Sequence, residues 1–98
     1  MAELRWTNQA ADDLQAICQF IARDSASYAS LIARNIIEAV ERARDFPTSG
    51  RIVPEVGDPA IRELLLGNYR IIDQHAGDTV VVLTVWHGAR LLRPEKFK

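Results

Sequence analysis

Apolar residues recur at helical spacing through most of the first half of the chain. In two segments, about 8–24 and Ser27 to Asp45, they fall three or four positions apart, which places them along one face of a helix. The stripes comprise Ala10, Leu14, Ile17 and Ile21 in the first segment, and Ala29, Ile32, Ala33, Ile36, Ile37, Val40 and Ala43 in the second. Two amphipathic helices joined by a few residues predict a helical hairpin over about residues 8–46.

Both helices have recognisable end signals. Thr7 or Asn8 can cap the first helix, because a side-chain oxygen there accepts from the free N–H groups of the first turn. Asp24-Ser25 closes that helix and offers a cap for the second. Phe46-Pro47 ends the second helix, since proline disfavours helical geometry in the residue before it.

The second half of the chain has a strand-like pattern, after a loop at 47–60 that holds three of the four prolines. Ile61–Leu66 and Tyr69–His75 flank Gly67-Asn68, a two-residue hairpin signal. Thr79–His87 is β-branched and nearly continuous in apolar character, as expected of a central strand.

A short alternating segment at residues 3–7 predicts one further strand ahead of the helices. The order β-α-α-β-β-β predicts an α+β fold, in which a small antiparallel sheet carries the helical hairpin on one face. We expect a single domain over residues 1–98, with the sheet at about 61–87 and a basic tail at 88–98.

One pairing of the predicted sheet concerns charged residues. The turn at Gly67-Asn68 places Arg62 opposite Asp73, where a cross-strand ion pair would make Arg62 structural. His75 borders the following turn and is expected to be a solvated loop residue.

The register of the last strand is open. A two-residue turn at Gly77-Asp78 pairs Arg70 with Val85 and places Arg70 and His87 on one face of the sheet. A three-residue turn pairs Arg70 with Thr84 and separates the two, because a slip of one residue turns every side chain to the other face.

Composition adds the broad class of protein. With 98 residues, 48% hydrophobic and 26% charged, the chain has the make-up of one small globular domain. It has no apolar run long enough for a membrane span and no secretory signal pattern, so we expect no membrane association. Cys18 is the only cysteine and lies beside an apolar stripe, where a buried, unreactive thiol is expected. A reducing, cytoplasmic setting follows.

The net charge of −1 combines two unlike halves. Residues 1–50 carry five basic and seven acidic groups, whereas residues 51–98 carry seven basic and six acidic groups. Arginine supplies ten of the twelve basic residues, and both lysines lie in the last three positions. This asymmetry is too small to indicate nucleic-acid binding by itself, but it places most candidate cations in the second half.

Most catalytic templates are absent. The chain has no glycine-rich phosphate loop, no serine elbow and no Cys/His cluster with metal spacing, so we expect neither a metal nor a cofactor. The groups that could converge are Arg51 and Glu55 in the long loop, Arg70 at a strand start, and His87 and Arg90 after the last strand. Guanidinium groups suit phosphate or carboxylate recognition, because their fork binds two oxygens at once.

Several short motifs occur together in one order over about residues 3–92. They are Trp6, Ala10-x-x-Asp13-Leu14-x-x-Ile17, Phe46-Pro47-x-x-Gly50-Arg51, Arg62-Glu63-Leu64, Tyr69-Arg70-Ile71 and Val85-x-His87-x-Ala89-Arg90. In this combination the chain resembles the ParE/RelE toxin superfamily of bacterial type II toxin–antitoxin modules. The resemblance implies a helical hairpin packed on a small antiparallel sheet, and a cognate ParD-like antitoxin that wraps the toxin in a hetero-oligomer.

The resemblance implies two competing functions. ParE-like toxins poison DNA gyrase by protein contact and are not enzymes, whereas RelE-like toxins cleave mRNA on the ribosome. Glu55, Arg70 and His87 match positions that some ribonuclease members use for catalysis. Those members commonly carry an aromatic residue after the histidine and a cluster of lysines; this chain has Gly88 and few lysines. The residues of its motifs are more similar to those of ParE-like sequences.

The leading hypothesis is therefore a ParE-like toxin that inhibits DNA gyrase, has no catalytic residues, and is neutralised by its antitoxin. The expected target-binding residues are Arg51, Arg62, Arg70, His87, Arg90 and Arg93, and the expected antitoxin-binding residues are Leu31 and Trp86. The alternatives are a ribosome-dependent mRNA endonuclease and an inactive toxin fold that serves only as a binding scaffold.

Overall fold

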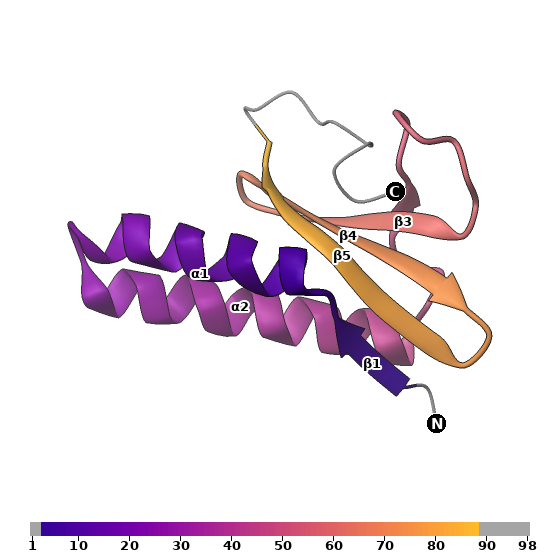
Figure 1. Ribbon diagram of the computed structural model, residues 1–98, viewed down its shortest axis with the longest axis horizontal. Helices are drawn as coiled ribbons and strands as arrows, with labels where there is room; N and C mark the ends of the chain where they lie inside the picture. The colour runs from indigo at the N-terminus through magenta and orange to yellow at the C-terminus, as the bar shows by residue number, and fades with distance from the viewer. Residues whose placement is uncertain (1–2, 89–98) are drawn as a thin grey trace.

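The computed structural model describes residues 3–88, which form a five-stranded sheet with two helices on one face (Figure 1). In chain order the elements are β1 (Glu3–Trp6), α1 (Asn8–Ala22), α2 (Ala26–Asp45), β2 (Arg51–Ile52), β3 (Ile61–Leu66), β4 (Tyr69–Ala76) and β5 (Thr79–His87). The predicted α+β fold and element order are confirmed. The predicted tail at 88–98, with Arg90 and Arg93, lies outside the described residues except for Gly88.

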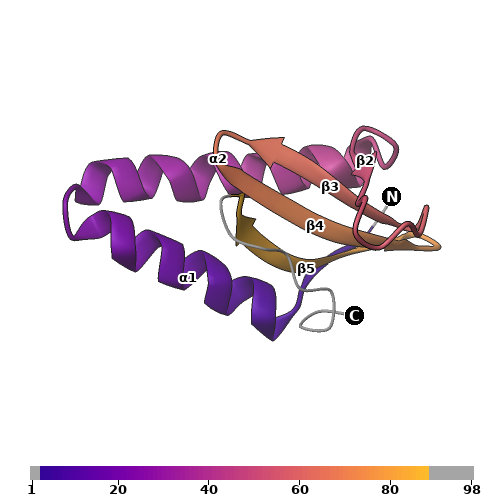
Figure 2. The same ribbon diagram turned by 90° about the horizontal axis from the view of Figure 1, so that it is seen from above.

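The two helices begin and end close to where their sequence signals place them. Thr7 caps α1, where its side-chain oxygen accepts from Ala10 N at 3.0 Å. Ser25 caps α2 in the same way, from Tyr28 N at 3.1 Å. The helices run side by side as a hairpin whose closed end extends beyond the sheet, as two perpendicular views agree (Figures 1 and 2).

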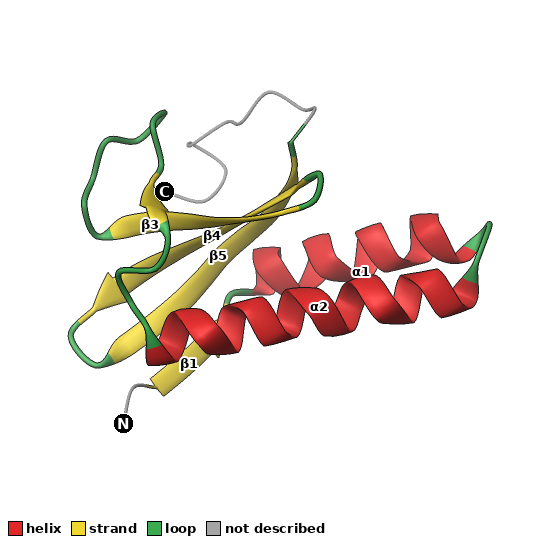
Figure 3. Cartoon of the chain, turned by 180° about the vertical axis from the view of Figure 1, so that it is seen from behind, coloured by secondary structure: helices red, strands yellow, loops and turns green. Residues whose placement is uncertain are grey.

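The sheet has the strand order β1-β5-β4-β3-β2 and differs from the prediction at both edges. β1 pairs with β5 in parallel, so the sheet is mixed and not purely antiparallel. The two helices that follow β1 cross one face of the sheet (Figure 3). β1 itself forms the edge next to β5 and runs in the same direction as β5. β2 was expected to be loop; with two residues it is too short to produce an alternating pattern.

The hairpin of β3 and β4 has the predicted register, with Arg62 opposite Asp73. The predicted ion pair between them is wrong. Arg62 instead donates to the Pro59 and Gly50 carbonyls at 3.0 and 3.2 Å, because the loop before β3 folds back beside this strand. Asp73 instead bonds to His75, the next residue on the same side of its own strand.

A β-bulge decides the open register of β5. The turn has two residues, since Ala76 pairs with Thr79, but Leu83 is an extra residue in β5 between the Asp73 and Ile72 pairings. Beyond the bulge Arg70 pairs with Trp86, which neither predicted register allowed for. Because Tyr69 pairs with His87 and neighbouring strand residues face opposite ways, Arg70 and His87 lie on opposite faces.

Each face of the sheet has its own apolar core. The core under the helices comprises Ala10, Ile36, Ala39, Val40, Ile71, Val82 and Val85. On the other face, the loop between β2 and β3 folds over a second core of Val53, Ile61, Ile72 and Leu83. The predicted stripe of α2 is largely confirmed, although Ile37 is 42% exposed and Ala39 is buried in addition.

None of the helices within residues 3–88 combines the length and the apolar character that crossing a membrane would require.

Candidate functional site

Arg70 lies on the sheet face opposite the helices, with its guanidinium between two carboxylates. Its Nε donates to Glu63 at 2.5 Å, while Nη1 and Nη2 donate to the two oxygens of Glu55 at 2.7 and 2.8 Å. Glu55 comes from the loop between β2 and β3. The Arg70–Glu55 pair is therefore bidentate, which is the geometry that matches a guanidinium fork to a carboxylate.

Glu63 joins Arg70 to Arg51. Its side chain has no exposed surface, and its second carboxylate oxygen accepts from Arg51 Nε at 2.7 Å. Arg51 is 57% exposed at the side chain, whereas Arg70 is only 14% exposed. The four side chains Arg51, Glu63, Arg70 and Glu55 alternate in sign and neutralise one another; we refer to them as the charge network.

Within the charge network, Arg70 and Glu55 keep each other ionised. Hydrogen bonds from Arg70 lower the pKa of Glu55 to about 2, against the opposing effect of burial. The bonds to Glu55 and then Glu63 raise the pKa of Arg70. A general base works best with a pKa near the working pH, so Glu55 held in this way is poorly suited to accept a proton.

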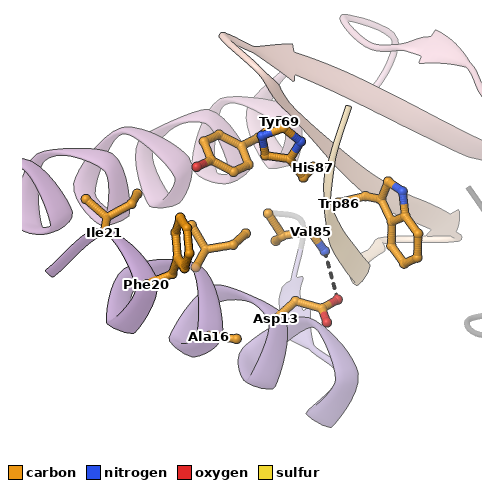
Figure 4. Close-up of a pocket in the computed structure, with 9 residues that line it drawn as sticks. Asp13, Ala16, Phe20, Ile21, Tyr69, Val85, Trp86 and His87 are labelled. Atoms are coloured by element: carbon orange, nitrogen blue, oxygen red, sulfur yellow. Dashed lines mark hydrogen bonds between the residues drawn. The ribbon is translucent and has the colours of Figure 1, made fainter. Parts of the chain in front are cut away.

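The register of β5 turns His87 to the helix side of the sheet, although His87 and Arg70 both line one hollow of about 400 Å³ at this end of the sheet. Its ring packs edge-on against Tyr69, with the ring centroids 5.4 Å apart and the planes at 88°. Burial raises the pKa of the Tyr69 hydroxyl. In Figure 4 the rings of His87 and Trp86 lie on opposite sides of β5, as expected for adjacent strand residues.

A cavity of about 500 Å³ separates α1 from the end of β5, beside His87 and Tyr69 (Figure 4). The α1 side of this cavity is formed by Asp13, Ala16, Ile17, Phe20 and Ile21. Phe20 is 69% exposed, which is unusual for a large aromatic side chain next to an apolar hollow. The cavity is mainly apolar in its lining, so it suits the side chains of a protein partner better than a charged ligand.

The bulge that turns His87 away from Arg70 is fixed by two side chains near the start of α1. Asp13 accepts from the Thr84 hydroxyl and from Val85 N, the latter at 3.2 Å (Figure 4). The Thr7 hydroxyl lies 3.0 Å from the carbonyl oxygens of both Val82 and Leu83. Thr7 and Asp13 therefore hold the bulged segment of β5 against the start of α1.

One polar pair was missed in the sequence. His75 lies in β4 and not in a loop, and its Nε2 is 3.0 Å from Asp73, whose side chain is 3% exposed. Burial raises the pKa of Asp73, although His75 and Arg62 act in the opposite direction. The two-residue spacing within one strand, which places both side chains on one face, is the signal that could have found them.

The structure thus brings together only part of the predicted set. Arg51, Glu55 and Arg70 meet in the charge network, whereas Arg62 binds loop carbonyls and His87 faces the helices. The positions of Arg90 and Arg93 are not described.

The two predicted antitoxin contacts have different surroundings. Leu31 is 39% exposed and lies near the start of α2. Trp86 is partly buried against the second core.

Other chemistry is sparse in the described part of the chain. No three His, Cys, Asp or Glu side chains among residues 3–88 are grouped to hold a metal ion. Cys18 is partly buried in α1, and burial raises the pKa of its thiol, which disfavours the reactive thiolate.

Comparison with known protein families identifies the family of this chain. The family described as "ParE toxin of type II toxin-antitoxin system, parDE" matches residues 4–92. The chain belongs to the ParE toxin family. It is thus a ParE-type toxin of a type II toxin–antitoxin system, as the motifs had indicated. No match is found among curated proteins.

Two solved structures resemble this ParE-family toxin in fold. One is a chromosomal ParDE toxin–antitoxin system from P. aeruginosa, at 24% identity and a TM-score of 0.73, covering 89% of this chain and 96% of that one. The other is the toxin–antitoxin complex RelBE2 from Mycobacterium tuberculosis, at 18% identity and a TM-score of 0.55, covering 88% and 96%. The ParE and RelE branches therefore share the fold, and the likeness of fold does not separate their activities.

Proposed function

We propose that this ParE-family toxin acts by protein contact, with DNA gyrase as its target, and that a ParD-like antitoxin neutralises it. The observation that carries the proposal is the separation of Arg70 from His87 on opposite faces of the sheet. The choice of gyrase follows from the resemblance of the motifs to ParE-like sequences.

The ribonuclease alternative requires a base, an acid and a cation around one phosphodiester. General acid–base catalysis needs each group within hydrogen-bond reach of the atom it serves. Here Glu55 and Arg70 bind each other, and His87 packs on Tyr69 across the sheet. Gly88 stands where an aromatic residue would stack on a base. These features favour contact with a protein over cleavage of RNA.

The hairpin offers a surface for the antitoxin. The two similar solved structures are described as toxin–antitoxin assemblies. On this chain, the two helices carry exposed Phe20, Tyr28 and Leu31 near the connection between α1 and α2. An apolar face next to the 500 Å³ cavity suits an amphipathic helix, which binds by laying its apolar side chains into a groove.

A supercoiling assay tests the target. Purified toxin added to gyrase, relaxed plasmid and ATP should block supercoiling, and prior addition of the antitoxin should restore it. Relaxation by a type I topoisomerase in the same buffer serves as the control and should be unaffected. Full supercoiling at a large molar excess of folded toxin would contradict the proposal.

Two further measurements address the alternatives. Transcripts should remain intact after induction of the toxin, whereas a ribonuclease would cleave them and lose that cleavage in His87→Ala. Expression without the antitoxin should arrest growth, whereas an inactive scaffold would be tolerated.

A further inference from the structure

Arg70 has a fixed guanidinium whose two outer nitrogens face Glu55 in the loop between β2 and β3. The bond from its Nε to the fully buried Glu63 holds the side chain in place, and β4 supplies its backbone. A free arginine loses much side-chain freedom when it binds a ligand, whereas a guanidinium oriented beforehand loses little. Arg70 is therefore a pre-organised receptor for a planar group with two oxygens.

Glu55 fills this receptor from a turn that is anchored independently of it. Val53 is fully buried in the second core, and its carbonyl accepts from Val56 N and Gly57 N at 3.1 and 2.9 Å. The Glu55 side chain is 36% exposed at the surface of this turn. Rotation of one side chain would release the fork, with no movement of the loop backbone.

The surroundings of the fork favour a protein carboxylate as its ligand. Leu65 pairs with Arg70 across the β3–β4 ladder and is 57% exposed beside it. A hollow of about 400 Å³ next to Arg70 is formed by Leu65, residues 67–69, and His87 and Gly88 at the end of β5. An arginine with an apolar neighbour is typical of the energetic centre of a protein interface.

Nucleic acid fits this surface less well. Binding to a phosphate backbone requires several unpaired cations in a row, because the affinity comes from neutralising many phosphates. The two arginines of the charge network are matched by two glutamates, and the chain as a whole has a net charge of −1.

We propose that the Arg70 fork receives one aspartate or glutamate side chain of the toxin's protein target, and that Glu55 occupies the fork in the free toxin. The exchange replaces one carboxylate by another and keeps the charge network neutral. Glu55 then competes with the target and sets how tightly the toxin binds. The receptor itself is independent of the identity of the target; that the target is gyrase rests on the function proposed above.

The first experiment uses the free toxin and acetate as the probe. In Glu55→Gln the fork keeps its shape but loses its competing charge, so the Arg70 Nε–H resonance should shift saturably with acetate. Wild-type toxin should need about tenfold more acetate, the ratio expected when a charge-assisted competitor is removed. Glu3→Gln, which removes the exposed carboxylate paired with Arg5, is the matched control and should behave as wild type.

The second experiment uses gyrase holoenzyme. Glu55→Gln should inhibit supercoiling at about a tenfold lower toxin concentration than wild type. In an Arg70→Lys background the same change should give no gain, because a lysine presents no fork. Melting curves check that each variant is folded.

The outcomes separate the two proposals. If wild-type toxin and all variants leave gyrase unaffected, the target proposed above is wrong, and the acetate titration alone decides on the receptor. An Arg70 resonance that ignores acetate in Glu55→Gln would overturn the receptor. Tighter binding of single-stranded RNA by Glu55→Gln, with a steep salt dependence and no response to acetate, would overturn the protein carboxylate as its ligand.

Discussion

Glu63 is the residue on which the charge network depends. A carboxylate with no exposed surface is tolerated only when its charge is compensated, and here each oxygen accepts from an arginine. Glu63 also determines where the Arg70 fork points, although it has no contact with solvent.

Removing the charge of Glu63 should destabilise the protein. Glu63→Gln leaves two arginines without their shared partner, one of them largely buried, so we expect a loss of about 3 kcal/mol in the free energy of unfolding. Urea denaturation at neutral pH measures it. The exposed Glu3→Gln should change stability by less than about 0.5 kcal/mol. Equal stabilities of the two variants would show that Glu63 contributes nothing beyond packing.

Glu55 should give stability that depends on pH. Its pKa is lowered in the folded protein from the ordinary 4.5 to about 2, so the ionised form is favoured by folding. Its contribution is therefore present above pH 4.5 and lost as the pH falls toward 2. The pair is partly exposed, so this contribution should stay below about 1 kcal/mol.

The comparison that isolates it is wild type against Glu55→Gln at several pH values. Their free energies of unfolding should differ at pH 7 and converge in acid, because the glutamine does not titrate. A difference that stays constant down to pH 3 would argue against the ion pair as its source.

At the scale of elements, α1 and β5 are joined through the bulge. Asp13 accepts from Thr84 and Val85, which follow the bulge directly, while Thr7 contacts the carbonyls of Val82 and Leu83. The N-cap and the second turn of α1 thus also stabilise an irregular strand far away in the sequence.

Asp13→Ala tests this connection. It leaves the buried Val85 N–H without its side-chain acceptor, and we expect a loss of about 2 kcal/mol in stability. Hydrogen exchange of the Val85 amide should accelerate more than exchange in β3. Asp12→Ala is the matched control, because Asp12 is exposed on the same helix and should be close to neutral. Similar effects of both substitutions would place the role of Asp13 in the helix alone.

Elements with a strong periodic signal could be predicted, and irregular ones could not. Ile61–Leu66 and Thr79–His87 begin and end as expected, because turn residues bound both strands. The bulge at Leu83 has no signal, since it lies in a continuous apolar run where an added residue disturbs no alternation. The Glu55–Arg70 pair was also beyond reach, because a loop residue and a strand residue share no periodicity. The arginine side chain by itself indicated anion recognition. That Glu55 is the anion it binds depends on how the loop between β2 and β3 folds back over the sheet.

At the scale of the whole molecule, two separate surfaces follow from the layering. The helical hairpin covers one face of the sheet and extends beyond it (Figures 1 and 2). The strand register places Arg70 of the charge network on the other face. A toxin with this arrangement can present one surface to its antitoxin and another to its target.

Phe20→Ser tests the hairpin surface. Phe20 is 69% exposed, so its loss should alter stability by less than about 0.5 kcal/mol. We expect antitoxin affinity to fall at least about tenfold, because exposed aromatic residues dominate interface energies. Titration calorimetry with purified antitoxin measures the effect.

Phe46→Ser is the matched control, since Phe46 is 65% exposed at the opposite end of α2. It should bind the antitoxin as wild type does. Equal losses in both variants would mean that the antitoxin contacts the full length of the helix, and no loss in either would remove the hairpin end from the interface.

The bulge in β5 has a consequence for comparing this toxin with its relatives. In a regular strand, counting residues from the Gly77-Asp78 turn tells which face of the sheet each side chain points to. The extra residue Leu83 reverses that assignment for every residue after it. A relative with the same motif letters but a regular strand would present its histidine beside its arginine, on a single face. The same sequence spacing can therefore place the arginine and the histidine on one face or on opposite faces of the sheet. A sequence alignment alone cannot distinguish the two arrangements.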